Sequence, residues 1–274
     1  MMHTDRTLQT HPRRHPRRAN GHPVSWKQAF IPLALVIFFL AWELIVRWGG
    51  YPAFILPTPR QVWMRLLVAL REGSLTMHVL VTLREVLGGL ALGLTVAVVL
   101  GYFLAKSRTL ERVLSPYIVA SQAVPIVALA PLLVIWFGAG SLSKVLVCAL
   151  TLFFPVLINT VVGIRSVDAE LRDLMRSLQA SRWQVFTLLE LPAALPVLFG
   201  GLKVGVTLSV IGAVVGEFVG ADRGLGFLVN LARGLFDTPL MFVALFTLMF
   251  IALALYLIVS ALEGWLLKWR WPEE

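Results

Sequence analysis

The chain has 274 residues, of which 58% are hydrophobic and 14% are charged, and its mean hydropathy is +0.82. Soluble globular domains carry about 25% charged residues, so this composition excludes an ordinary water-soluble domain and predicts a protein that contacts membrane lipid. The formal net charge of +9 does not indicate a nucleic-acid partner, because the basic residues lie between apolar runs. A single cysteine, Cys148, cannot form an intrachain disulfide.

Residues 1–27 are rich in arginine, histidine and proline. They predict a disordered basic tail rather than a signal peptide, because the polar part is too long for one. Lysine and arginine are more frequent in this tail, between 165 and 182 and near the C-terminus than in the other loops. The positive-inside rule therefore predicts a multi-pass protein of the inner (plasma) membrane with both termini in the cytoplasm.

Six apolar runs follow the tail. A helix needs about 20 apolar residues to cross a bilayer core about 30 Å thick. The runs predict an all-α polytopic membrane protein with six transmembrane helices in one transmembrane domain of residues 28–270. They cover residues 29–46, 86–105, 113–138, 145–164, 193–219 and 240–262.

Two of these runs have features that bear on packing. The run 113–138 contains three prolines, which lack the amide of an intrahelical bond, so a break there needs protein or water around it. We expect this run to be buried or to line a cavity. The run 86–105 has a small residue at every fourth position, which favours close helix contact: Gly89, Gly93, Ala97, Gly101 and Ala105.

The loop 166–192 is predicted to form two short helices. Ser181 and Gln184 fit a capping box at the start of the second helix, and Pro192 is expected to stop that helix or redirect it into the next run. The exposed apolar face of the first helix requires a protein groove or interfacial lipid. Its apolar positions have the i, i+3, i+4, i+7 spacing of one helix face: Leu171, Leu174, Met175 and Leu178.

Residues 174–192 resemble the signature cytoplasmic loop of binding-protein-dependent ATP-binding-cassette permeases. Within that family the chain is similar to the nitrate, sulfonate and taurine group, which also includes vitamin and vitamin-precursor permeases. The resemblance spans nearly the whole chain, and further motifs occur in the family's order: residues 55–59, 82–84, 131–138, 153–159 and 217–226.

This resemblance implies the type I importer fold with cytoplasmic coupling helices. It implies three partners: an ATPase subunit, an extracellular or periplasmic substrate-binding protein, and a second permease copy as a homodimer. Gln179 stands where the family has a turn glycine, which tolerates positive φ without penalty. The residues expected to contact the ATPase are Asp173, Leu178, Gln179, Ala180, Ser181, Arg182 and Phe186.

The chain has no phosphate-binding Gly-x-x-x-x-Gly-Lys-Ser/Thr loop. ATP is therefore expected to be hydrolysed by a partner, and no cofactor or metal is expected on this chain. Polar residues inside spans are candidates for function. Asn159, Ser209 and Glu217 are the candidates for the translocation path or gate, with helix pairing as the alternative for Asn159 and Glu217.

Two other classes of protein were weighed against the importer permease. A secondary transporter that works without ATP would need several buried titratable residues, and only Glu217 is convincing. An enzyme within the membrane would need a nucleophile–base pair or a metal cluster, and all five histidines lie outside the spans. The substrate stays open between a sulfonate-like or nitrate-like anion and a vitamin or vitamin precursor such as riboflavin or a thiamine pyrimidine.

Overall fold

A computed structural model describes residues 26–268, and all the elements in that range are helices. Almost all of the predicted tail 1–27 lies outside the described residues. The helices are α1 (Trp26–Gly49), α2 (Pro59–Arg71), α3 (Ser74–Lys106), α4 (Arg108–Gln122), α5 (Ile126–Phe137), α6 (Ser141–Arg165), α7 (Ala169–Ser177), α8 (Arg182–Val185), the π-helix η1 (Phe186–Glu190), α9 (Leu191–Gly220), α10 (Leu225–Gly234) and α11 (Thr238–Leu266).

Five of the six apolar runs fall within single helices, and the run 113–138 is divided between α4 and α5. Four helices of the described chain are long and apolar enough to cross a membrane: α3, α6, α11 and the continuous helix Arg182–Gly220. The pair α4 and α5 would make a fifth span if it is counted as one broken helix. Helix α1 covers the first run over 24 residues, and its place as a sixth span stays a prediction.

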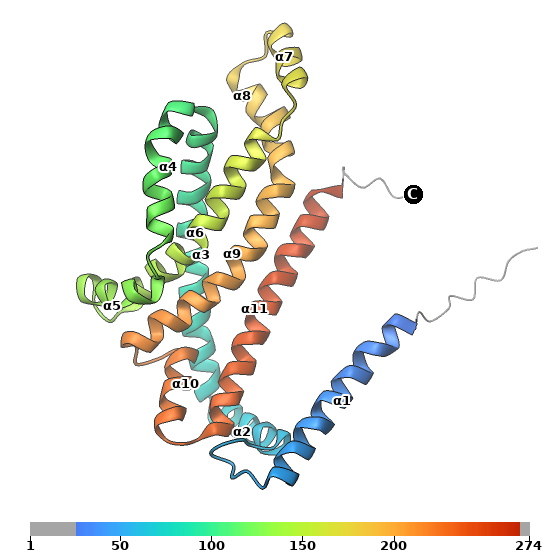
Figure 1. The fold of residues 1–274 in the computed structure, drawn as a ribbon, viewed down its shortest axis with the longest axis vertical. Helices are drawn as coiled ribbons and strands as arrows, with labels where there is room; N and C mark the ends of the chain where they lie inside the picture. The colour runs from blue at the N-terminus through green and yellow to red at the C-terminus, as the bar shows by residue number, and fades with distance from the viewer. Residues whose placement is uncertain (1–25, 269–274) are drawn as a thin grey trace, which may run out of the picture.

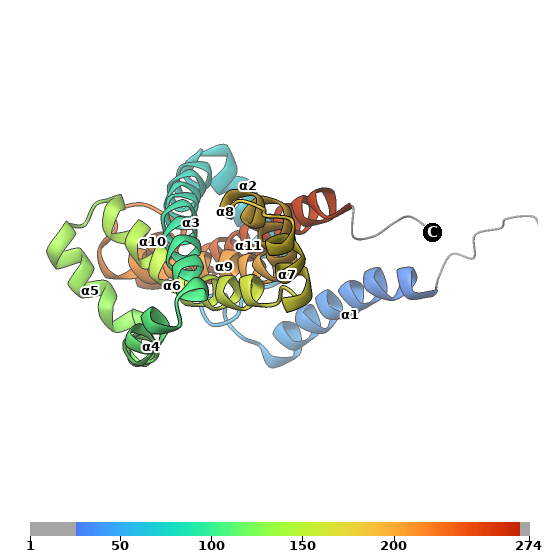
Figure 2. The same ribbon diagram turned by 90° about the horizontal axis from the view of Figure 1, so that it is seen from above.

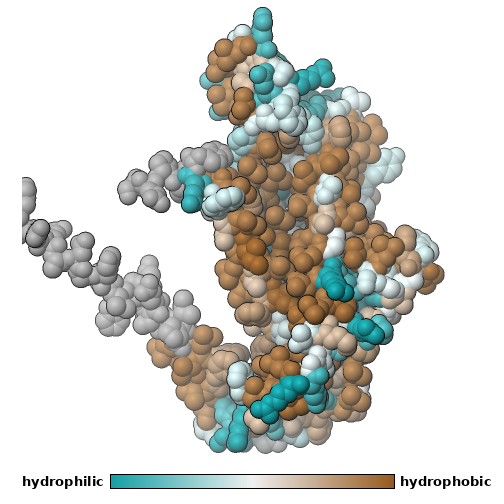
Figure 3. Space-filling model, turned by 180° about the vertical axis from the view of Figure 1, so that it is seen from behind, coloured by the Kyte–Doolittle hydropathy of each residue, from teal (hydrophilic) through white to brown (hydrophobic). Residues whose placement is uncertain are grey.

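The long helices α3, α6 and α9 lie against one another and form the centre of the bundle, with α11 beside α9 (Figures 1 and 2). Helices α7 and α8 lie at one end of the bundle and α10 lies at the opposite end (Figure 1). We call these the α7 end and the α10 end. On the face drawn in Figure 3, apolar side chains cover most of the body, and hydrophilic side chains gather mainly towards the two ends.

The small-residue stripe of α3 packs against α6, as its spacing predicted. A Cβ atom added to Gly93 would lie 2.7 Å from the Ala149 carbonyl oxygen, and one added to Gly101 would lie 2.7 Å from Thr160 Cβ. On α9, a Cβ added to Gly201 would lie 2.7 Å from Asn159 Cβ. Helix α6 therefore packs between two glycine-bearing helices, and their backbones come closer than larger residues would allow.

Helix α3 begins at Ser74, whereas the apolar run predicted a start at Val86. The additional turns contain His78, Thr82 and Glu85, which are polar but buried at 6%, 0% and 3% exposure. Their side chains contact other helices instead of water. The buried part of α3 therefore extends beyond the apolar run that the sequence shows.

The broken run divides into α4 and α5, which meet at an angle of 95°. The break lies beside Pro125, while Pro116 and Pro131 lie inside helices. The expectation that this run is buried or lines a cavity is met only in part by the single chain. Helix α5 packs against α6 and α9 and buries Ala130 and Leu133. Helix α4 has no buried residue, and Tyr117 is 71% exposed. Lining of a cavity by this run stays a prediction.

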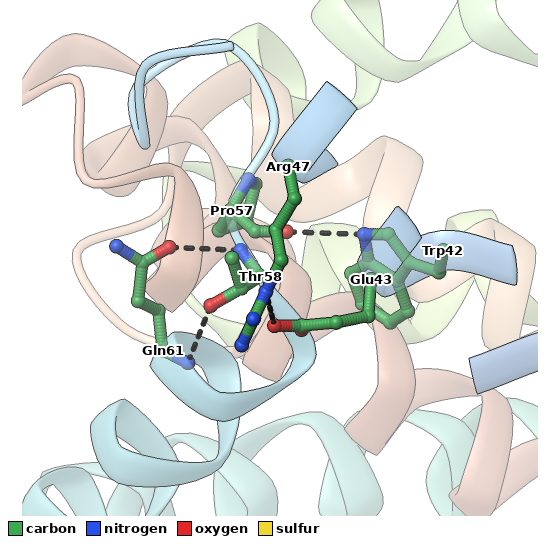
Figure 4. Close-up of polar contacts among 6 residues, drawn as sticks. All are labelled: Trp42, Glu43, Arg47, Pro57, Thr58 and Gln61. Atoms are coloured by element: carbon green, nitrogen blue, oxygen red, sulfur yellow. Dashed lines mark hydrogen bonds and ion pairs between the residues drawn. The ribbon is translucent and has the colours of Figure 1, made fainter. Parts of the chain in front are cut away.

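Helix α1 is fastened to the bundle at the α10 end only (Figures 1 and 4). The indole N–H of Trp42 donates to the Pro57 carbonyl oxygen over 3.0 Å, and the Trp42 ring stacks on Phe242 of α11 with centroids 5.4 Å apart. Thr58 and Gln61 form a capping box at the start of α2. The rest of α1 leans away from the bundle, and its described side chains there are largely exposed.

The glycine contacts of α3 give a first prediction. Gly93→Ala should lower the free energy of unfolding by about 1–3 kcal/mol, because the added methyl group meets the backbone of α6 and cannot be accommodated without a shift. Thermal unfolding in detergent micelles measures the effect. Gly200→Ala is the matched control, since a Cβ atom there meets nothing within 4 Å. Equal melting temperatures for the two variants would contradict this account of the packing.

Candidate functional site

The candidate coupling segment comprises α7, the turn 178–181, α8 and η1, at the α7 end of the bundle (Figure 1). The spacing-based prediction of a first short helix is confirmed by α7. Leu178 and Trp183 are 68% and 71% exposed, and Leu174 is 53% exposed. A surface with large apolar side chains at a helix–turn–helix tip indicates a site of contact with another molecule.

The turn between the two helices is held by local hydrogen bonds. The Ala180 amide donates to the Met175 carbonyl over 3.0 Å. Ser181 and Gln184 form the predicted capping box, in which the Gln184 amide donates to Ser181 Oγ over 3.3 Å and the Ser181 amide donates to Gln184 Oε1 over 2.7 Å. The turn is therefore a defined shape that is determined by its own residues.

Gln179 has a φ of 53°, in the left-handed region. This is the conformation that a glycine would adopt without strain, and for another residue it costs about 1–2 kcal/mol. The backbone at Gln179 therefore has the positive φ that the family glycine tolerates. Hydrogen bonds made by the neighbouring residues hold the turn in this shape.

The second short helix does not stop at Pro192 but continues into the next run, so only the first of the two alternatives expected for Pro192 is wrong. Helix α8, η1 and α9 form one continuous helix from Arg182 to Gly220. Pro192 lies at the start of α9, and the preceding turn is widened to the π form, in which the Leu191 amide donates to the Phe186 carbonyl. The wider turn carries the helix past a residue that has no amide to donate.

The seven predicted contact residues lie together in this segment but do not share one environment. Asp173, Leu178 and Gln179 are exposed around the tip, as are Ser181 and Arg182, while Ala180 is partly buried in the turn. Phe186 faces the bundle instead. Its ring is half-buried and packs edge-on against Tyr102 of α3, with centroids 5.2 Å apart. The tip and the inner side of the segment therefore offer different contacts.

Glu217 lies in a buried polar cluster at the α10 end and is 1% exposed. Thr82 Oγ1 donates to Glu217 Oε1 over 2.6 Å, and the Gly226 amide donates to Glu217 Oε2. The Leu225 amide in turn donates to Thr82 Oγ1 over 2.8 Å. These bonds join α3 and α9 to the connection that leads into α10.

The connection into α10 contains two glycines, Gly224 and Gly226, whose lack of a side chain allows the contacts of this cluster. Gly224 has a φ of 112°, which side chains rarely adopt, and its amide donates to His78 Nδ1 over 3.0 Å. A Cβ atom at Gly226 would lie 2.8 Å from Glu217 Oε2. The motif 224–226 therefore allows the backbone to approach the carboxylate closely enough for direct hydrogen bonds.

The ammonium groups of two lysines within the spans, Lys144 and Lys203, are bound by other groups of the same chain. Lys144 is 1% exposed, and its ammonium donates to carbonyl oxygens that include Gly220 at the end of α9, over 2.7 Å. Lys203 pairs with Glu263 of α11. Neither ammonium is free in the described structure.

Asn159 and Ser209 serve helix contacts within the single chain. The Asn159 side-chain amide donates to the Pro155 carbonyl over 2.8 Å, and its side chain lies against Gly201. Ser209 is fully buried, and its hydroxyl donates to the Val86 carbonyl of α3 over 3.4 Å. Lining of a translocation path by these residues or by Glu217 stays a prediction.

Sequence reasoning missed the partners that make these sites. The sequence placed Thr82 in the motif 82–84 without a partner, although Thr82 and Glu85 are both buried close to Glu217. The signal that could have found them is their spacing, because 78, 82 and 85 lie on one face of a helix. Within residues 26–268, no group of three or more side chains could hold a metal ion.

The described chain thus combines at least four membrane-length helices with an exposed helical tip at one end of the bundle. Residues 93–270 match the family of binding-protein-dependent transport system inner membrane components. The chain belongs to this family, as its resemblance to ATP-binding-cassette permeases predicted.

Three relatives indicate the range of the family around this chain. It is 51% identical over 255 residues to the riboflavin transport system permease protein RibX of Chloroflexus aurantiacus, covering 93% of this chain and 95% of the relative. It is 36% identical over 248 residues to the formylaminopyrimidine transport permease protein ThiX of Halalkalibacterium halodurans, covering 89% and 98%. It is 30% identical over 262 residues to the taurine transport system permease protein TauC of Escherichia coli, covering 93% and 95%.

The chain is therefore a permease subunit of an ATP-binding-cassette importer and a multi-pass component of the inner membrane. In such systems a partner ATPase hydrolyses ATP, and transport depends on a substrate-binding protein. This membership favours the importer over the secondary transporter that was weighed against it.

The cluster around Glu217 gives a second prediction. Thr82→Val should lower the melting temperature and make the 220–226 connection more sensitive to proteolysis. The reason is that a buried carboxylate oxygen and a buried amide each lose a hydrogen bond, at a cost of about 1–3 kcal/mol per group. Thr82→Ser keeps the hydroxyl and should retain most of the stability. If the serine and valine variants behave alike, the hydroxyl is not what holds the connection.

Proposed function

We propose that the exposed tip of the coupling segment docks in a groove of the ATPase on the cytoplasmic side of the membrane. The observation that carries this proposal is the apolar exposure of Leu178 and Trp183 on a turn whose shape is fixed by a capping box. Asp173 and Arg182 would lie at the rim of the contact. With the tip inside, α10 faces outward, both termini are cytoplasmic, and α1 and the α4–α5 pair complete six spans.

The proposed functional unit contains two copies of this chain. Helix α4 has no buried residue and exposes Tyr117 and Val119 at 71% and 66%. A broken helix is tolerated at membrane depth where protein or a water-filled cavity surrounds it. A second copy that covers α4 and α5 would supply that surrounding, and a translocation path would then run between the copies. Asn159, Ser209 and Glu217 remain the candidates to line or gate it.

The proposed substrate is a vitamin-type heterocycle, with riboflavin as the first candidate. The support is the 51% identity to the riboflavin permease, compared with 30% to the taurine permease. The lysines within the spans support the same choice. Lys144 is held by carbonyl oxygens and Lys203 by Glu263, so neither is offered to a small anion such as a sulfonate. The binding protein would deliver the substrate at the α10 end.

The docking proposal gives a third prediction. Ala180→Glu should abolish co-purification of the ATPase in mild detergent, because a carboxylate would be placed within an apolar contact without a partner. The measurement is the ratio of ATPase to permease in a tagged pull-down, with thermal unfolding as a check on folding. Ala180→Ser is the matched control and should keep the complex. Full retention of the ATPase by a folded Ala180→Glu variant would contradict docking at this turn.

The substrate proposal gives a fourth prediction. A bacterial strain that can neither make nor import riboflavin should grow on micromolar riboflavin when it carries this chain with its ATPase and binding protein. The Ala180→Glu variant should not support growth. Binding of riboflavin and of taurine to the purified binding protein, measured by fluorescence quenching and calorimetry, separates the two substrate classes. Binding of taurine alone would make the vitamin assignment wrong while leaving the importer in place.

A further inference from the structure

The coupling segment has one deeply buried residue, and it is an acid. Within α7 and α8 no residue is buried, and in η1 only Glu190 is, at 1% exposure. Its Oε1 accepts a hydrogen bond from Lys106 Nζ in the last turn of α3. A carboxylate removed from water is unfavourable unless it is paired. The ion pair with Lys106 therefore fixes where the base of the segment meets α3.

Aromatic contacts reinforce the same turn of α3. Lys106 Nζ lies 5.6 Å from the centroid of the Tyr102 ring, and Tyr102 packs edge-on against Phe186 of η1. Glu190 and Phe186 are the two ends of the π turn. Both ends of η1 are thus attached to one turn of α3. We call these contacts, Glu190 with Lys106 and Phe186 with Tyr102, the junction between the segment and the bundle.

The junction lies beside an open space. A hollow of about 590 Å³ is lined by residues of α3 and of the coupling segment, including Tyr102, Trp183 and Phe186. The hollow opens to the molecular surface, so the described chain does not fill the space between this part of the segment and α3. A single π turn in a longer α-helix is a recurrent feature of functional sites. The ion pair is the contact that would limit movement of the segment relative to α3.

Helix α3 connects this junction to the opposite end of the bundle. It is continuous over 33 residues, or about 50 Å at 1.5 Å per residue. Near its start, His78 and Thr82 hold the 224–226 connection through two amides. At its end, Arg165 of α6 donates to the Leu104 carbonyl over 3.0 Å and pairs with Glu111 of α4. A displacement of the end of α3 would therefore reach α4, α6 and α10.

We propose that Glu190 and Lys106 are positioning residues that make the coupling segment and α3 move as one unit, so that α3 carries ATPase motion to the α10 end. The inference rests on the proposed docking of the segment tip on the ATPase. It adds that α3 is the helix that receives the movement of the ATPase. Glu190 sits below the docking surface, so its loss should leave the ATPase bound while the link to α3 is broken.

The test uses the complex of the full chain with its ATPase, in nanodiscs. Spin labels at Ser177→Cys on α7 and Val99→Cys on α3 report the distance between segment and helix, with Cys148 replaced by alanine. In the otherwise unchanged chain the distance should be the same without nucleotide and after trapping with ATP and vanadate. With Glu190→Gln it should shift by several ångströms on trapping. A shift that is equally large with Glu190 in place, or no shift in the variant, would overturn the proposal.

A second readout measures coupling in proteoliposomes. Glu190→Gln and Lys106→Gln should retain ATPase binding and basal ATP hydrolysis, and lose about tenfold in stimulation by the binding protein loaded with riboflavin. The double exchange Glu190→Lys with Lys106→Glu should recover part of the stimulation. Lys203→Gln is the matched control, since it breaks another ion pair between helices and should leave the stimulation unchanged.

The two proposals fail in different ways. If the ATPase does not co-purify with the unchanged chain, or is retained by Ala180→Glu, docking at the tip is wrong. If the ATPase is bound and the label distance in Glu190→Gln stays constant on trapping, docking stands and the role of Glu190 and Lys106 is wrong. The distance measurement needs only ATP and vanadate. Its result therefore does not depend on which substrate the importer carries.

Discussion

The architecture depends on the close approach of α6 to the glycine-bearing faces of α3 and α9. Lipid provides no hydrophobic drive for helices to associate, so their contact relies on packing and on polar pairs. Gly93 and Gly101 let α3 approach the α6 backbone, and Gly201 does the same for α9. Two polar sites are arranged on this three-helix centre: the Glu217 cluster at one end, and the coupling segment with the Lys106–Glu190 pair at the other.

The local pattern of hydropathy and residue spacing in the sequence predicted most of the helices, but it did not predict the contacts between them. The apolar runs marked the long helices, and the spacing of Leu171 and Leu178 marked α7. The Thr82–Glu217 and Lys106–Glu190 pairs join residues 135 and 84 positions apart. Local hydropathy does not show that Thr82, Glu190 and Glu217 are buried, and only the packing of α3 against α9 and η1 reveals it. The helix–turn–helix shape of the segment was predictable because it depends on caps and turns, which are local.

Polar residues within the spans of this importer subunit are used mainly to join its own elements. Lys144 donates to a carbonyl oxygen at the end of α9, Glu217 holds the connection to α10, and Glu190 holds the coupling segment. These three charged groups are engaged by partners within the chain, so they are not offered to a substrate within the membrane. This fits a transporter that leaves recognition to a separate binding protein and uses its helices to open and close a path.

The turn at Gln179 has a consequence for assembly. Its left-handed backbone is kept in place by the Ala180 amide and by the Ser181–Gln184 capping box, before any partner is present. A surface that is already ordered loses little conformational entropy when it binds, so more of the contact energy is expressed as affinity. The free-energy cost of the left-handed backbone at Gln179 is thus a cost of folding the subunit. It is not added to each cycle of nucleotide binding and release.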